Sequence, residues 1–316
     1  WWYKNPFNKY GGIVNYQFKL FLLKTVKLLV KENYSPDYIL FDWIQSSFFI
    51  KNIKKVFPNS KIICVEQDVV YLNFLRRKQI AKGIIEKVYN FIRFEIVKKN
   101  EIKTLAAADE VLVLNQKDKN LLIKDAPNLS SIRVVSPYYH SFINTKYIGL
   151  NKNIVFYGAM NRMENYEAAI WFIENVFCKL NFSFNFIIIG NAPPEKLLKY
   201  KSNRVQILGF VDDVSPYFSE SLCMVVPLIV GAGIKIKVLE GFSAGIPVLT
   251  NDIGIEGIMA QNGIEYLYCS SPQDYIDGIH KLASDKNFAA AISNNAKRFM
   301  LKNFNFEKDS YMLGKT

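Results

Sequence analysis

Apolar residues along the chain gather in short continuous runs of Val, Ile, Leu and Phe, and the stretches between them place apolar residues at helical spacing. Such runs are typical of strands covered on both faces. They predict strands over 38–44, 61–65, 110–115, 153–158, 184–190, 205–210, 222–228 and 246–251. The other stretches predict helices over 17–31, 46–57, 73–108, 116–124, 164–180, 193–201, 215–220, 235–244 and 272–284. This alternation predicts an α/β fold with parallel sheets.

The pattern pauses in a polar stretch over 144–153, and the chain of 316 residues is long enough for about two domains. We therefore expect one domain over 1–148, a second over 149–300, and a C-terminal helix over 301–316 that packs back toward the first. Because the chain opens with Trp1 instead of Met, we expect the first domain to be truncated at its start.

The positive charge is confined to the first half. Residues 1–150 contain 24 Lys and Arg against 12 Asp and Glu, whereas residues 151–316 contain 16 of each. A basic half favours an anionic partner, such as a phosphorylated substrate, an acidic membrane surface or nucleic acid. The helix over 17–31, with four lysines, is either a domain helix with a solvated face or a helix that lies on an anionic membrane.

Composition excludes several classes of protein. Half of the residues are hydrophobic and 22% are charged, which predicts a packed core and no global disorder. The four cysteines and two histidines form no cluster in the sequence, which argues against a zinc site. The most apolar stretch, 222–234, is shorter than the ~20 residues that a membrane span needs. Motifs of nucleic-acid-binding domains are missing from the sequence, and the basic residues are spread over several helices.

The densest candidate chemistry lies in 227–250, where a glycine loop leads from a strand into a helix. Free N–H groups at such a helix start hold phosphate oxygens. Lys235 and Lys237 lie in the first turn, where the helix dipole disfavours cations, so a bound anion explains them. Glu240, near the same face, is placed to accept hydrogen bonds from ribose hydroxyls. The alternative is a packing loop with solvated lysines.

Residues Ile154 to Phe306 resemble the retaining family known as glycosyl transferases group 1. The resemblance rests on FYGAMNRMENYEAAIWF (156–172) and on VVPLIVGAGIKIKVLEGFSAGIPVLTNDIGIEG (225–257). More loosely, EQDVVYLNFLRRK (66–78) and AAADEVLVLNQKD (106–118) are similar to the last portion of that family's acceptor domain. The resemblance implies the GT-B fold, with two Rossmann-like domains facing a cleft.

The same resemblance implies transfer of a sugar from a nucleoside-diphosphate sugar to an acceptor, with retention and without a metal or other cofactor. We expect a role in bacterial surface polysaccharide or glycolipid synthesis, with a saccharide or lipid-linked acceptor and no nucleic acid. The expected location is cytoplasmic, peripheral on the inner face of the plasma membrane, with the basic half on the anionic surface.

Residue by residue, the resemblance gives Lys237 the stabilisation of charge on the departing diphosphate and Glu240 the binding of the ribose. It assigns donor binding to Gly158, Asn161, Arg162, Gly190, Phe210, Gly231, Gly233, Lys235, Gly254 and Glu256. Gln67, Asp68 and Arg76 follow the strand predicted over 61–65 and are candidates for the acceptor side. The alternative is that they are solvated residues at a helix start.

The sequence departs from the family pattern in three places. Ala232 stands where many relatives have the first of two glutamates, although a subgroup shares the GAGIKIK form. Ala159 and Glu164 stand where relatives often have Arg and Lys, with Arg162 nearby, and Gln67 stands in place of a histidine that contacts the donor sugar. The sequence leaves open a sugar-nucleotide epimerase-like GT-B protein, a catalytically inactive remnant and a basic nucleic-acid-binding protein.

Overall fold

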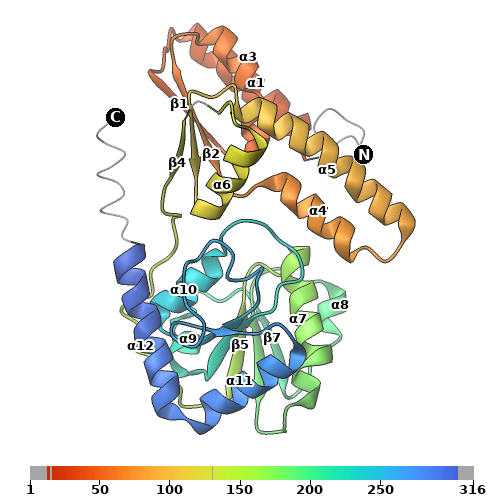
Figure 1. Ribbon diagram of the computed structural model, residues 1–316, viewed down its shortest axis with the longest axis vertical. Helices are drawn as coiled ribbons and strands as arrows, with labels where there is room; N and C mark the ends of the chain where they lie inside the picture. Colours follow the sequence, from red (N-terminus) through yellow and green to blue (C-terminus); the bar gives the residue numbers. More distant parts are fainter. Residues whose placement is uncertain (1–12, 15, 130, 305–316) are drawn as a thin grey trace. The chain divides into compact units, whose positions relative to one another are not determined.

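The structure is a computed structural model that describes residues 13–14, 16–129 and 131–304. The chain divides into two compact units, residues 1–135 and residues 136–316 (Figure 1). Each unit contains its own parallel sheet, as the alternation of strands and helices predicted. The predicted helix over 301–316 lies largely outside the described residues.

The first unit has a four-stranded sheet in the order β1-β2-β3-β4, with all pairs parallel. The strands are β1 (Tyr38–Asp42), β2 (Lys61–Glu66), β3 (Glu110–Val113) and β4 (Ile132–Val134). The helices are α1 (Tyr16–Lys31), α2 (Ile44–Ser47), α3 (Ile50–Val56), α4 (Val70–Ile80), α5 (Ile84–Leu105) and α6 (Gln116–Asp125). Buried apolar side chains from the strands and from α1, α3, α4, α5 and α6 form one core.

The single helix predicted over 73–108 is instead two helices, α4 and α5, joined by a turn at Ala81–Gly83. Ala81 and Gly83 both have an extended conformation, so the helical backbone ends after Ile80 and begins again at Ile84. The predicted helix over 46–57 is likewise divided between α2 and α3, and the short strand β4 was not predicted.

The second unit has a six-stranded parallel sheet in the order β10-β9-β8-β5-β6-β7. Its strands are β5 (Asn153–Tyr157), β6 (Asn185–Ile189), β7 (Val205–Gly209), β8 (Cys223–Val226), β9 (Val248–Thr250) and β10 (Leu267–Tyr268). After β7 the chain returns to the other side of β5 to form β8. Ligands of parallel sheets bind at this kind of reversal, beyond the carboxyl ends of the strands.

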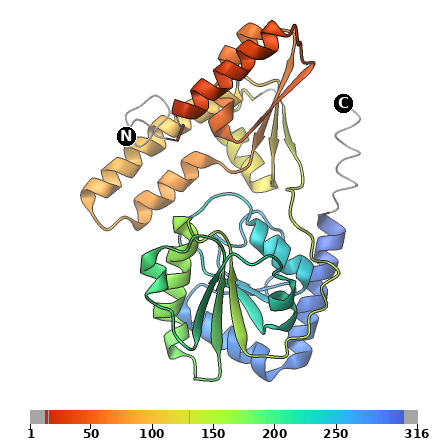
Figure 2. The same ribbon diagram turned by 180° about the vertical axis from the view of Figure 1, so that it is seen from behind.

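Helices surround the sheet of the second unit, and Figure 2 shows them from behind the view of Figure 1. They are α7 (Met163–Asn175), η2 (Phe177–Lys179), α8 (Glu195–Leu198), α9 (Ser215–Glu220), α10 (Ile236–Ala244), α11 (Pro272–Ser284) and α12 (Lys286–Asn303). The helix α10 packs closely on the sheet at Gly241. A Cβ added there would lie only 2.4 Å from Met224 Cε. The short strand β10 and the helix α12 were not predicted.

The division between the units lies earlier than the boundary expected after residue 148. Residues that precede β5 bind along the second unit: the N–H of Phe142 donates to Ser243 Oγ (2.9 Å), and Tyr147 Oη donates to the carbonyl of Leu222 (2.8 Å). The N–H of Ile148 also donates to the carbonyl of Ser219 (2.8 Å). These bonds attach the segment to the second unit.

Candidate functional site

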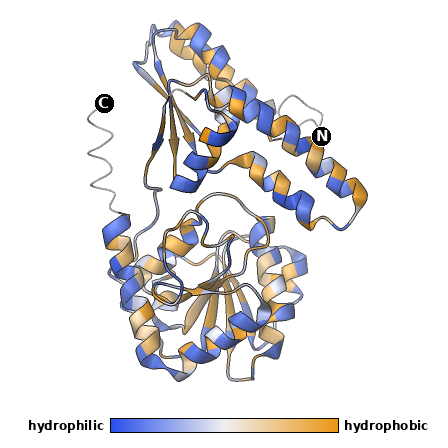
Figure 3. Cartoon of the chain, in the orientation of Figure 1, coloured by the Kyte–Doolittle hydropathy of each residue, from blue (hydrophilic) through white to orange (hydrophobic). Residues whose placement is uncertain are grey.

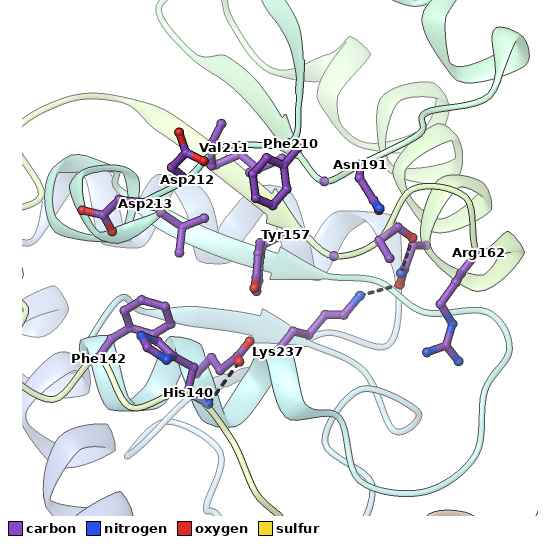
Figure 4. Close-up of a pocket in the computed structure, with 17 residues that line it drawn as sticks. His140, Phe142, Tyr157, Arg162, Asn191, Phe210, Val211, Asp212, Asp213 and Lys237 are labelled. Carbon is purple, nitrogen blue, oxygen red and sulfur yellow. Dashed lines mark hydrogen bonds between the residues drawn. The ribbon is translucent and has the colours of Figure 1, made fainter.

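A cavity of about 570 Å³ opens in the second unit at the carboxyl ends of β5, β6 and β7 (Figure 4). It therefore lies at the reversal in strand order. Its lining comes from the loops after these strands, from α10 and from the segment before β5: His140, Phe142, Tyr157, Gly158, Ala159, Arg162, Asn165, Ile189, Gly190, Asn191, Phe210, Val211, Asp212, Asp213, Val214, Lys237 and Glu240.

Two glycines keep the backbone of this cavity open. Gly158 follows β5 with a φ of +151°, and a Cβ there would lie 2.6 Å from Lys237 Nζ. Gly190 follows β6 with a φ of +152°, and a Cβ there would lie 1.7 Å from the carbonyl oxygen of Gly158. A Cβ at Gly190 would collide with the main chain, and one at Gly158 would displace the end of the Lys237 side chain, so both positions favour glycine.

Lys237 lies in the first turn of α10 and points into the cavity (Figure 4). Its ammonium donates a hydrogen bond to Asn165 Oδ1 and lies 5.0 Å from the ring centroid of Phe156. Asn165 is held in turn, because its Nδ2 donates to the carbonyl of Ala159 (2.8 Å). Burial, reinforced by repulsion from Arg162, lowers the pKa of Lys237 to about 7. A bound anion would restore the charge of this amine.

Glu240 lies three residues further along α10 and is 8% exposed. Its Oε1 lies 3.4 Å from the N–H of His140, which donates to it. Burial raises the pKa of Glu240 to about 7, although the His140 N–H and Lys237 both favour the carboxylate. A carboxylate in this position suits a pair of sugar hydroxyls, which donate hydrogen bonds that water cannot supply in a buried site.

The far side of the cavity is formed by the loop after β7. Phe210 begins this loop and is 73% exposed, with its ring at the cavity (Figure 4). An exposed aromatic ring at a cavity edge offers a stacking face for a planar group such as a nucleobase. Asp212 and Asp213 follow it in the lining. Phe210 was predicted from the sequence, but the two aspartates were not.

Arg162 also lines the cavity, from the N-cap of α7. Its guanidinium pairs with Glu164 Oε1 at 2.6 Å, and the Arg162 side chain is 60% exposed. Ala159, where an arginine was expected from the family pattern, lines the cavity without a charged group. A guanidinium is therefore present three residues later than the pattern places it.

Six of the predicted donor-binding residues do not belong to the lining of this cavity, as the described residues define it: Asn161, Gly231, Gly233, Lys235, Gly254 and Glu256. Lys235 is the N-cap of α10, and its ammonium donates to the carbonyls of Ala232 (3.1 Å) and Gly233. It also lies 3.6 Å from Glu256 Oε2, and the two side chains are 10% and 4% exposed. This cation therefore ties the glycine loop to the segment after β9.

Gly254 has a structural reason of its own. A Cβ at this position would lie 1.8 Å from Thr250 Oγ1, and the N–H of Gly254 donates to Asn251 Oδ1 (3.1 Å). Gly254 thus allows the turn after β9 to fold tightly against the strand.

The three residues predicted on the acceptor side lie in the first unit, after β2 or on α4. Gln67 donates from Nε2 to Asp42 Oδ1 (2.7 Å), which joins the ends of β2 and β1. Asp68 follows it, and Arg76 lies on α4. Their arrangement is described within that unit alone.

His140 and Phe142 are the lining residues that sequence reasoning missed most clearly. They come from the segment before β5, about a hundred residues ahead of α10. Their ring centroids lie 4.5 Å apart, at an interplanar angle of 66°. No motif near them in the sequence indicates this position, because they reach the cavity through contacts with residues far along the chain.

Among the described residues, no group of His, Cys, Asp and Glu could hold a metal ion, and no helix is both long and apolar enough to span a bilayer.

The chain resembles known proteins in sequence and in fold. Residues 151–285 match the family described as "Glycosyl transferases group 1". A relative described as an uncharacterized 44.6 kDa protein in the cps region of Klebsiella pneumoniae is 23% identical over 291 residues, which cover 88% of this chain and 74% of the relative.

Solved structures give the fold. Sucrose-phosphate synthase from Thermosynechococcus elongatus is similar with a TM-score of 0.74 at 15% identity, covering 93% of this chain and 76% of that one. HepE of Anabaena, solved in complex with UDP and glucose, is similar with a TM-score of 0.74 at 12% identity, covering 95% and 81%. The chain therefore has the GT-B fold, and its residues 151–285 match the glycosyl transferases group 1 family.

Proposed function

We propose that this protein transfers a sugar from a nucleoside-diphosphate sugar to an acceptor hydroxyl, with retention at the anomeric carbon and without a metal. The observation that carries the proposal is Lys237. It is a desolvated amine at the start of α10, it lines a cavity at the reversal of a parallel sheet, and Glu240 lies on the next turn. Such a position suits a diphosphate next to a ribose.

The chemistry requires a cation where the sugar leaves. When the bond between the anomeric carbon and the diphosphate oxygen breaks, negative charge grows on that oxygen. A preorganised ammonium in a site shielded from water stabilises this charge, and the N–H groups in the first turn of α10 add to it. Arg162 supplies a second positive group at the same cavity. The acceptor hydroxyl forms the new bond, and its proton leaves with the diphosphate.

The lining suggests how a nucleotide lies. The cavity volume falls within the range of about 300–1,000 Å³ that ligand sites have. We assign the pyrophosphate to the open backbone at Gly158 and Gly190, the ribose to Glu240, and the base to the exposed ring of Phe210. In this arrangement one end of the donor lies on α10 and the other on the loop after β7.

We further propose a role in bacterial surface polysaccharide or glycolipid synthesis, at the cytoplasmic face of the plasma membrane. Support comes from the Klebsiella relative in a cps region and from S. aureus TarM, which was solved with UDP, a saccharide and an N-acetylglucosaminyl glycerol and has a TM-score of 0.70. The acceptor in this proposal is a saccharide or lipid-linked saccharide. In this proposal the basic first half of the chain is attracted to the anionic membrane surface.

A thermal-shift screen against UDP, GDP, dTDP and CMP, with and without EDTA, tests the proposal. A ligand that binds the folded state at a hundredfold over its Kd adds about 2.7 kcal/mol of stability. We expect one nucleoside diphosphate to stabilise the protein equally in EDTA, and Lys237→Met and Glu240→Ala to weaken the effect. Lys199→Ala, at an exposed lysine that ends α8, serves as the matched control. If no nucleotide shifts the transition, the proposal is wrong.

A further inference from the structure

The helices α4 and α5 of the first unit form a hairpin whose closed end presents aliphatic side chains to solvent. Ile80 is 51% exposed, Ile84 79%, Ile85 84% and Val88 54%. We call these four residues the hairpin tip. In Figures 1 and 2 the hairpin extends beyond the sheet of its own unit, and Figure 3 shows hydrophobic residues at its closed end.

The exposure at the tip contrasts with the rest of α5. Further along the same helix, Val97 and Leu105 are 0% and 1% exposed and belong to the core of the unit. Ile84 and Val88, four residues apart, therefore share a face that the core does not reach. Aliphatic groups clustered in this way on a surface mark a site of interaction, because each loses the free energy that burial would give it.

The charges around the tip select the partner. Residues 76–93 contain six basic residues and one acidic residue, Glu86. Lys82 and Lys87 are exposed beside the tip. Aliphatic groups that enter the boundary of the acyl chains, with lysines that reach the phosphates above them, are the arrangement of a segment that lies on an anionic bilayer.

Two other partners fit the tip less well. Nucleic-acid bases stack on aromatic rings, but the four residues of the tip are aliphatic, and Phe91, outside the tip, already has Lys78 Nζ 4.3 Å from its ring centroid. A second copy of the chain would bring two basic surfaces together, which is unfavourable.

The helix α1, for which the sequence left open a domain helix or a helix on an anionic membrane, packs one face against the core of its unit. Its Val26 is 8% exposed and belongs to the core, with Leu22 and Leu29 packed against that core. The ring of Phe18 lies 6.2 Å from that of Phe49. A face of α1 is thus used to build the unit, whereas the hairpin tip contributes nothing to the core.

We propose that the hairpin tip docks on an anionic lipid surface, with Ile84 and Ile85 inserted and Lys82 and Lys87 on the headgroups. This inference rests on the proposed function for its purpose, since docking would bring a lipid-linked acceptor to the enzyme. The docking surface itself is defined by the first unit alone.

Co-sedimentation of the full chain with sucrose-loaded vesicles tests the docking. We expect partitioning onto vesicles with 30% phosphatidylglycerol to exceed that onto pure phosphatidylcholine by at least about tenfold. Ile84→Glu/Ile85→Glu should lower the partitioning by at least about tenfold, because two buried aliphatic groups are lost. Phe182→Glu, at an 89% exposed position in the second unit, is the matched control and should bind as the wild type does.

A charge variant separates binding to anionic lipid from non-specific hydrophobic adsorption. Lys82→Glu/Lys87→Glu should remove most of the preference for anionic vesicles while the protein stays folded. The proposal is overturned if the wild type binds neither kind of vesicle, or if Ile84→Glu/Ile85→Glu binds as tightly as the wild type. It is also overturned if the hairpin variants lose self-association or RNA binding while vesicle binding stays unchanged. All these variants should keep the thermal shift with the nucleoside diphosphate, so failure here is distinct from failure of the proposed function.

Discussion

Both units bury ionisable side chains close to the carboxyl end of a parallel strand, but the buried groups have different surroundings. In the second unit, Lys237 and Glu240 line a cavity of about 570 Å³. In the first unit, Glu101 is 0% exposed, and its two carboxylate oxygens accept hydrogen bonds from the N–H groups of Val70 (2.9 Å) and Tyr71 (3.1 Å). The Glu101 side chain therefore caps the first N–H groups of α4, which is a structural role. A buried ionisable side chain indicates a ligand site when it faces open space.

The order of the strands explains where open space arises. In the second unit the chain reverses direction across the sheet at β5, so the loops after β5 and β8 lead to opposite sides and leave a crevice between them. The described strands of the first unit follow chain order from β1 to β4. Their ends therefore carry no such reversal. This unit instead carries the excess of positive charge and the exposed hairpin tip.

The largest effect that we predict is on sugar transfer in Lys237→Met. The variant retains the length of the side chain but not its charge, so turnover should fall about 10²–10³-fold, as when an electrostatic donor to a transition state is removed. Product formation from the donor identified by thermal shift measures this. A variant that retains at least half of the wild-type turnover would remove Lys237 from the reaction, and Lys199→Ala controls for the loss of a lysine.

The next largest effect is on stability at the cavity floor. Gly190→Ala places a Cβ 1.7 Å from the carbonyl oxygen of Gly158, so the backbone must shift, and we expect a loss of about 3 kcal/mol in the free energy of unfolding. Gly209→Ala is the matched control. It has a φ of +74° but nothing within 4 Å of the added Cβ, so about 1 kcal/mol should be lost. Equal losses in denaturant titrations would show that the clash does not exist.

A smaller effect should follow from Glu101 in the first unit. Glu101→Ala removes the acceptor for two buried N–H groups at the start of α4, and we expect a loss of about 2 kcal/mol in the free energy of unfolding. Glu101→Gln keeps one acceptor and should lose less. Urea titrations at pH 6 compare the two, and nucleotide binding in the second unit should stay unchanged in both. A loss of nucleotide binding would contradict the separation of roles.

The same group gives a pH dependence with a definite sign. Burial raises the pKa of Glu101 from 4.5 to about 8, and burial beside Glu101 also raises that of Glu66. The folded state therefore favours the protonated form. Its contribution is fully present below about pH 4.5 and is lost as the pH rises to about 8. Glu101→Gln should flatten the fall in stability across this window, which denaturant titrations at several pH values can measure. An unchanged slope would show that Glu101 does not titrate there.

Much of the second unit could be predicted from the sequence. The strands are continuous apolar runs, and the glycine loop with Lys237 and Glu240 is local, so both the elements and the central pair of the site followed from neighbouring residues. The division of the basic stretch into α4 and α5 was missed, because a single glycine at position 83 reduces helix formation without ending it. The short strands β4 and β10 give too brief a pattern to recognise.

The rest of the site depends on contacts between distant residues. His140 reaches Glu240 because the segment before β5 folds along the second unit, and nothing near residue 140 indicates this. Lys235 and Glu256 were both predicted to bind the donor, but their pairing at 3.6 Å was not predicted. Two lysines with the same local signal therefore differ because one of them finds a buried carboxylate and the other faces the cavity.

Calorimetric titration of UDP at pH 8, in buffers with different enthalpies of ionisation, tests the central claim most directly. Burial lowers the pKa of Lys237 to about 7, so the amine is mostly neutral at pH 8, and a bound diphosphate should recharge it. We predict that the wild type takes up a large fraction of one proton on binding and that Lys237→Met takes up almost none. If UDP binds without proton uptake, or if the variant takes up as much as the wild type, Lys237 is not the group that meets the diphosphate.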